Sequence, residues 1–79
     1  MENRKKYDKV FMDSFSIEKS KLGDDLIYES VSEWDSVGHM GMIADLEETF
    51  DIMLETDDII DFSSYNKGIE ILAKYKIKF

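Results

Sequence analysis

The amino-acid sequence predicts an all-α fold: a small antiparallel helical bundle of three main helices and one short helix, with a long loop between the first two. Apolar residues recur at helical spacing in four stretches. Alternation with period two is confined to residues 75–79, a segment too short and too terminal to indicate a sheet. No proline interrupts the helical stretches. We expect residues 1–79 to form a single domain, because so short a chain cannot divide its apolar residues between two cores.

The first helix is predicted over residues 3–15, where large apolar side chains repeat every three or four positions at Tyr7, Val10, Phe11 and Phe15. A loop of about twenty residues follows. Loops of that length are uncommon in compact domains and are usually functional. Isolated apolar residues are expected to pin this loop to the bundle: Ile17, Leu22, Leu26, Ile27 and Val31.

The second helix is predicted over residues 36–50, with Asp35 or Ser36 capping its first N–H groups. Two glycines, Gly38 and Gly41, lie inside this helix, where glycine is unfavourable. They either admit a neighbouring backbone or leave the start of the helix mobile. A stripe at helical spacing is expected to face the core: His39, Met42, Ile43, Leu46 and Phe50.

A second, smaller apolar group lies on another side of the same helix. It comprises Val37, Met40 and Ala44, and it shares that side with Glu47 and Glu48. A helix that only packs on a core needs one apolar stripe. The second group therefore indicates a partner-docking surface, or else it packs beneath the long loop.

A short third helix is predicted over residues 57–61, with Thr56 as its cap and acidic residues in its first turn. The fourth helix is expected to begin after a cap at Ser63 or Ser64. Its apolar face would carry Tyr65, Ile69 and Leu72. We interpret the remaining residues, up to 79, as a helix end and a fraying tail.

The charge is negative and unevenly distributed. The net charge is −8, and residues 22–66 contain thirteen Asp and Glu residues but no Lys or Arg. Such a surface repels nucleic acid and attracts a partner with a basic patch, or else it only aids solubility. No apolar run reaches the roughly 20 residues that span a bilayer, and no apolar segment follows the basic N-terminus as in a secretory signal. We therefore expect a cytoplasmic protein without a membrane-bound segment.

The chain offers little for catalysis or metal binding. It has no cysteine, which excludes disulfides, thiolate metal sites and thiol nucleophiles. A catalytic triad of Asp35, Ser36 and His39 fails because His39 falls on the core stripe, one turn away from Ser36. The acids around residues 57–61 lack the spacing and the glycine of a calcium-binding EF-hand loop. We expect neither enzymatic activity nor a dedicated metal site.

One residue is singled out by its place in the chain. Ser36 lies where an acidic loop turns into an amphipathic helix, so its hydroxyl is expected at the positive end of a helix dipole. An anionic group attached there would be stabilised by the exposed N–H groups. A small acidic domain that presents one serine is typical of a protein that is modified and then docks.

The sequence resembles the acyl carrier proteins over its whole length. The segment Asp35-Ser36-Val37, followed by residues 43–52 (IADLEETFDI), is similar to the Asp-Ser-Leu motif of that family and to its Leu-Glu-Glu-x-Phe helix ending. The resemblance implies an acyl-carrier-protein-like bundle. It also implies that Ser36 carries a 4′-phosphopantetheine arm, which a phosphopantetheinyl transferase adds from coenzyme A.

By the same resemblance, acyl or aminoacyl groups would ride on this arm as thioesters. Partner enzymes would then be a loading ligase and downstream synthases or transferases, in fatty acid or secondary metabolite biosynthesis, and the carrier would be a monomer. Five positions would contact partners: Asp35, Val37, Met40, Glu47 and Glu48. The alternative is an unmodified acidic adaptor with the carrier fold, which binds a basic partner through its second helix. The cargo, and whether it enters the core, stay open.

Overall fold

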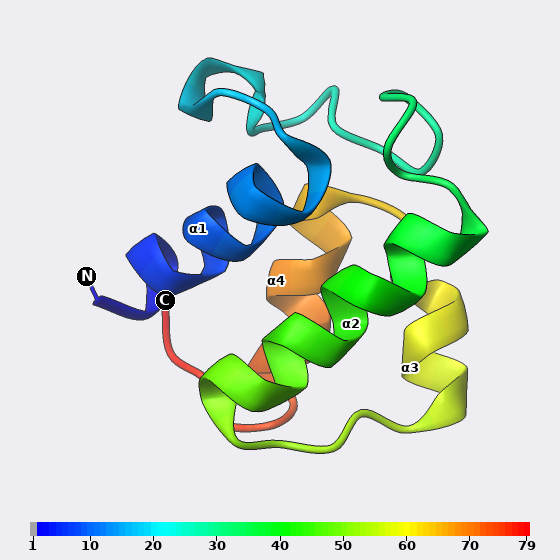
Figure 1. The fold of residues 1–79 in the computed structure, drawn as a ribbon. Helices are drawn as coiled ribbons and strands as arrows, with labels where there is room; N and C mark the ends of the chain where they lie inside the picture. The colour runs from blue at the N-terminus through cyan, green and yellow to red at the C-terminus, as the bar shows by residue number, and fades with distance from the viewer. Residues whose placement is uncertain (1) are drawn as a thin grey trace.

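The structure, a computed structural model that describes residues 2–79, is an all-α bundle (Figure 1). Its elements are α1 (Glu2–Phe15), a 3-10 turn η1 (Lys19–Lys21), α2 (Ser36–Phe50), the short α3 (Thr56–Asp61) and α4 (Tyr65–Ala73). α1 packs on α2, α4 lies behind both, and α3 flanks α2 on the side away from α1 (Figure 1). The predicted fold class is confirmed, with three main helices, one short helix and the long loop in the expected places.

The helix ends follow the capping residues in two of the three predicted places. α2 begins after Asp35, whose side chain accepts a hydrogen bond from the Gly38 N–H at 2.8 Å. α4 begins after Ser64, whose hydroxyl accepts from the Lys67 N–H at 2.9 Å. The expectation for α3 is wrong, because Thr56 is the first helical residue and Glu55 holds the cap position without a side-chain hydrogen bond.

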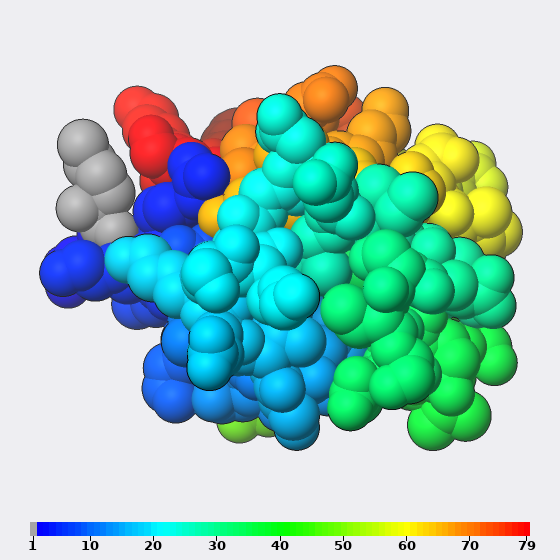
Figure 2. Space-filling model, turned by 90° about the horizontal axis from the view of Figure 1, so that it is seen from above, coloured from blue at the N-terminus to red at the C-terminus, as the bar shows by residue number. Residues whose placement is uncertain are grey.

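The long loop lies across one end of the bundle, as Figure 2 shows from above. Its anchors are the buried side chains of Leu26 and Trp34, together with a short backbone pairing. In that pairing the Tyr28 N–H donates to the Ser63 carbonyl, and the Tyr65 N–H donates to the Leu26 carbonyl. The predicted side-chain anchor at Ile27 is wrong: this side chain is half exposed, and the pairing opposite Ser64 is made by the backbone of Leu26 and Tyr28 on either side of it.

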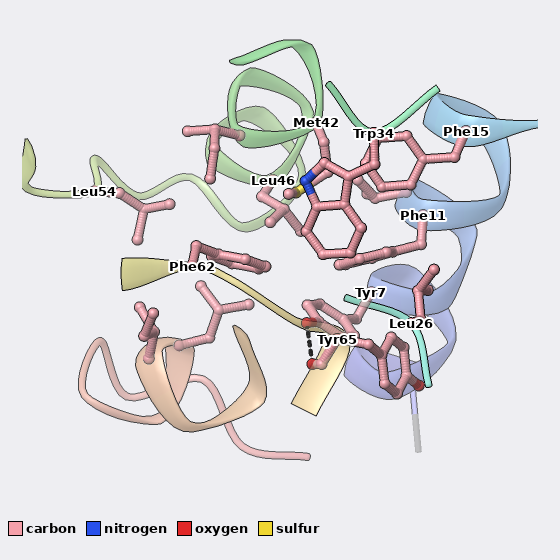
Figure 3. Close-up of a cluster of buried hydrophobic side chains, with 14 residues drawn as sticks. Tyr7, Phe11, Phe15, Leu26, Trp34, Met42, Leu46, Leu54, Phe62 and Tyr65 are labelled. Carbon is pink, nitrogen blue, oxygen red and sulfur yellow. Dashed lines mark hydrogen bonds between the residues drawn. The ribbon is translucent and has the colours of Figure 1, made fainter. Parts of the chain in front are cut away.

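Aromatic rings fill the centre of the bundle (Figure 3). The Trp34 ring stacks on Phe15 at 5.0 Å between centroids and meets the edge of Phe11 at 5.5 Å. The Tyr7 hydroxyl donates to the Tyr65 carbonyl at 2.6 Å, drawn dashed in Figure 3. Burial raises the pKa of the Tyr7 phenol, so this hydroxyl stays a donor at neutral pH.

The C-terminal tail packs against the bundle. The Phe79 ring lies 5.3 Å from Tyr7 and 6.5 Å from Phe50 between centroids, and Ile77 packs on the core. The Asn3 side-chain amide donates to the Lys78 carbonyl at 3.0 Å. The expectation of a fraying tail is therefore wrong, since the side chains of Ile77 and Phe79 pack against the core.

The two glycines of α2 have different surroundings. A Cβ at Gly38 would lie 1.9 Å from the Glu33 carbonyl oxygen, because the loop backbone crosses the first turn of the helix there. A Cβ at Gly41 would meet nothing within 4 Å. The sequence left two explanations for these glycines, a neighbouring backbone that comes close or a mobile helix start. For Gly38 the first explanation is correct. Gly41 has no steric reason to be glycine.

The short helix α3 is fastened to the end of α4 by one carboxylate. Asp58 is buried and accepts hydrogen bonds from Lys74 Nζ and from the Tyr75 hydroxyl, both at 2.5 Å. The Tyr75 oxygen in turn accepts from the Glu55 N–H at 2.9 Å. The hydrogen bonds from Lys74 and Tyr75 lower the pKa of Asp58 below its ordinary value.

We predict that Asp58→Asn lowers the melting temperature, whereas Asp57→Asn, an exposed neighbour, leaves it nearly unchanged. Because the folded state lowers the pKa of Asp58, the unfolded chain takes up the proton first. The stabilisation is thus fully present above about pH 4 and is lost as the pH falls further. Thermal unfolding of both variants between pH 7 and pH 3 checks this, and equal melting temperatures at pH 7 would contradict it.

We also predict opposite effects for alanine at the two glycines of α2. Gly41→Ala should raise the free energy of unfolding by about 0.5–1 kcal/mol, because alanine restricts the unfolded backbone and has room in the helix. Gly38→Ala should lower it by about 1–3 kcal/mol, since the new Cβ collides with the Glu33 carbonyl. Urea unfolding measures both values. A Gly38→Ala chain as stable as the parent would show that the loop does not cross α2 so closely.

Candidate functional site

Ser36 is the first residue of α2 and is exposed to solvent. The preceding residue, Asp35, has extended backbone angles (φ −108°, ψ −168°) and caps the helix through its side chain. Ser36 therefore lies at the end of a 15-residue helix where the first N–H groups have no partner within the helix. Such a helix start favours an anionic substituent.

A surface groove of about 330 Å³ opens beside Ser36, between α2, α3 and the loop. Apolar side chains make up most of its lining, and none of the lining side chains is a carboxylate, lysine or arginine. A groove of this size can hold a small organic group. The residues that line it are Tyr28, Ser36, His39, Met40, Ile59, Ile60, Phe62 and Ser63.

His39 lines this groove and is only half buried. It lies on the predicted core stripe of α2 but is less buried than Met42, Ile43 and Leu46 of the same stripe. The Trp34 indole N–H donates to His39 Nδ1 at 2.9 Å. His39 Nε2 lies 2.9 Å from the Ile59 carbonyl oxygen. Because both ring nitrogens are engaged elsewhere, the imidazole does not serve as a base for the Ser36 hydroxyl.

The second apolar group of α2 lies in the solvent. Val37 is 81% exposed and Met40 is 54% exposed, and Ala44 is exposed as well. The alternative that these residues pack beneath the long loop is therefore wrong. An exposed valine and methionine beside the serine form an apolar patch of the kind that partners cover.

The two glutamates of α2 differ in their surroundings. Glu48 is exposed. Glu47 is half buried, and its Oε2 accepts from the Leu54 N–H at 2.9 Å, which ties the segment after α2 back onto the helix. One of the two predicted recognition carboxylates thus has a structural partner within the chain, and the other is free to contact another molecule.

Several residues around Ser36 were missed by sequence reasoning. Tyr28 and Ile60 line the groove, and Trp34 anchors the loop two positions before the serine. Ile60, 72% exposed, had a usable signal: two adjacent isoleucines in a helix of six residues cannot both face the core. Trp34 had none, because it stands alone in an acidic loop without periodicity.

Among residues 2–79, no group of three or more His, Asp or Glu side chains is arranged to hold a metal ion. None of the helices in the same part of the chain combines the length and the apolar character that crossing a membrane requires.

Comparison with known proteins points in one direction. No protein-family model matches the chain. The chain is similar to an acyl carrier protein of Lactobacillus johnsonii (strain CNCM I-12250 / La1 / NCC 533), with 24% identity over 67 residues. The matched region covers 85% of this chain and 84% of that protein. This distant similarity extends over most of the chain and agrees with the all-α bundle.

Proposed function

We propose that the chain is an acyl or aminoacyl carrier protein whose 4′-phosphopantetheine arm is attached to Ser36. The observation that carries this proposal is the exposed Ser36 hydroxyl at the capped start of α2, beside an apolar groove. The distant similarity to an acyl carrier protein over 85% of the chain supports it. The carrier itself would perform no chemistry on its cargo.

The residues around Ser36 fit such an arm. The phosphodiester would lie at the start of α2, where backbone N–H groups and the helix dipole favour an anion. The arm would supply the thiol that holds cargo as a thioester, a group that a chain without cysteine cannot provide. The apolar lining that Tyr28, Met40 and Ile60 give the groove suits the uncharged part of an arm or a small cargo.

Attachment requires transfer of the 4′-phosphopantetheinyl group from coenzyme A to Ser36, which a phosphopantetheinyl transferase would catalyse. The Ser36 hydroxyl oxygen bonds to the phosphorus that bears the pantetheine of coenzyme A. The phosphoanhydride bond breaks, and adenosine 3′,5′-bisphosphate leaves. The hydroxyl proton passes to a base of the transferase, because His39 is engaged by Trp34 and Ile59.

The exposed side of α2 would dock the partner enzymes. Val37 and Met40 supply the apolar contact, and Glu48 supplies a charge that a basic partner would meet. Asp35 contributes mainly by capping the helix and so presenting Ser36. Glu47 contributes less than Glu48, because one of its oxygens already accepts from Leu54. The partners we propose are the transferase, a loading ligase and downstream synthases or transferases.

We predict that incubation with coenzyme A and a broad-specificity phosphopantetheinyl transferase adds one phosphopantetheinyl group to the parent chain and none to Ser36→Ala. Intact-mass spectrometry measures the addition. Ser32→Ala, which changes an exposed serine in the loop just before α2, serves as the matched control and should still be modified.

Failure of several transferases to modify the folded parent chain would overturn the proposal. The function left standing would then be the unmodified acidic adaptor. That adaptor would bind a basic partner through Val37, Met40 and Glu48, and its binding would survive Ser36→Ala.

We predict that Glu48→Gln slows modification of Ser36 by up to about fivefold at low salt, as expected for one exposed charge contact. The difference should shrink at high salt, because screening weakens exposed contacts. Glu70→Gln, which removes an exposed charge on α4, is the matched control. Initial rates measured at two salt concentrations decide the matter. Equal effects of the two variants would mean that total charge, not a contact at Glu48, steers the transferase.

A further inference from the structure

The chain has one tryptophan and one histidine, and they are bound to each other. The hydrogen bond runs from Trp34 Nε1 to His39 Nδ1, and the two ring planes are nearly parallel, with centroids 6.2 Å apart and an angle of 11° between planes. The other ring nitrogen of His39 faces the Ile59 carbonyl at 2.9 Å. One imidazole thus joins the loop before Ser36, the first turns of α2, and α3.

These contacts fix the protonation state of the ring. An indole N–H can only donate, so Nδ1 of His39 must accept. A backbone carbonyl can only accept, so Nε2 must carry the hydrogen. The bonded ring is therefore neutral, with its proton on Nε2. A second proton on Nδ1 would place two donors against each other and break the bond to Trp34.

The ring is faced by the side chains of Trp34, Tyr28 and Phe62 and by the lining of the groove. The titratable side chain that packs against it is Tyr28, at 5.7 Å between centroids. The groove on its outer side carries no carboxylate. Asp35 at the start of α2 accepts from the Gly38 N–H, and Asp58 of α3 is engaged by Lys74 and Tyr75. On the inner side lies the Phe62 ring.

We propose that His39 is a positioning residue for Ser36, and that it acts as a latch which is closed when its ring is neutral and open when the ring is protonated. Closed, the latch holds Trp34 and Ile59 against the first turns of α2, so Ser36 and the groove beside it keep one arrangement. When the latch is open, α3 and the loop before Ser36 are no longer held to the first turns of α2. The link to Ser36 rests on the proposed carrier function, whereas the latch itself does not.

Three variants separate the latch from ordinary packing. In His39→Gln the amide oxygen can accept from Trp34 and the amide nitrogen can donate to Ile59, but the side chain does not titrate. In His39→Ala both bonds are lost. In Trp34→Phe the aromatic packing is largely kept, but the indole N–H is gone. A proton on His39 Nδ1 would then no longer face a second hydrogen-bond donor.

The first experiment measures urea unfolding and Trp34 fluorescence from pH 8 to pH 5.5. Because acid also reduces the repulsion among the many carboxylates, the quantity that decides is the difference between parent and His39→Gln. Relative to His39→Gln, the unfolding equilibrium constant of the parent should rise severalfold on going to pH 5.5. Parent fluorescence should change over the same range, and the fluorescence of His39→Gln should not.

His39→Ala should be less stable than the parent at pH 8, and Trp34→Phe should lose most of the pH dependence that separates the parent from His39→Gln. If parent and His39→Gln respond to pH alike in stability and fluorescence, no latch exists. The same holds if Trp34→Phe keeps the full pH dependence of the parent.

The second experiment compares modification of Ser36 in the parent and in His39→Gln at pH 8 and pH 5.5, which cancels the pH profile of the transferase itself. The ratio of the two rates should be near one at pH 8, and the parent should be severalfold slower at pH 5.5. A ratio independent of pH would show that His39 does not position Ser36. If neither chain is modified at any pH, the carrier proposal fails, while fluorescence and unfolding still decide whether the latch exists.

Discussion

Burial of the Trp34 indole is the constraint on which the rest of the structure depends. The ring is fully buried against Phe11 and Phe15, yet it belongs to the acidic loop and carries an N–H that needs an acceptor. His39 supplies that acceptor from α2. Since Trp34 stands two residues before Ser36, burying its ring determines where α2 begins and where the serine emerges.

The groove beside Ser36 depends on how α3 is held. A helix of six residues is not stable by itself, so its position is set by outside contacts. Polar contacts at two of its residues hold it: His39 of α2 meets the Ile59 carbonyl, and Asp58 accepts from Lys74 and the Tyr75 hydroxyl. The wall of the groove is therefore fixed by directional hydrogen bonds as well as by apolar packing.

The sequence predicts the main helices well because their signals are local. Residues 36–50 combine a cap, helical periodicity and an exposed second face, and α2 has these bounds and an Asp35 cap. The surroundings of Ser36 depend on contacts between distant segments, for which no local pattern exists. The bond between His39 and the Ile59 carbonyl, and the pairing of residues 27 and 64, could not be predicted for this reason. Likewise, no local pattern around Glu47 indicates that its carboxylate accepts a hydrogen bond from the Leu54 N–H.

Hydrogen exchange of the Trp34 indole N–H, followed by NMR on the unmodified chain at neutral pH, tests most directly whether this residue anchors the site. If the ring is buried and bonded to His39, its N–H should exchange as slowly as the backbone amides of Phe11 and Leu46, which are fully buried core residues. An indole N–H that exchanges rapidly while those amides stay protected would show that the loop moves independently of the bundle. In that case Ser36 would not be presented by a preorganised site.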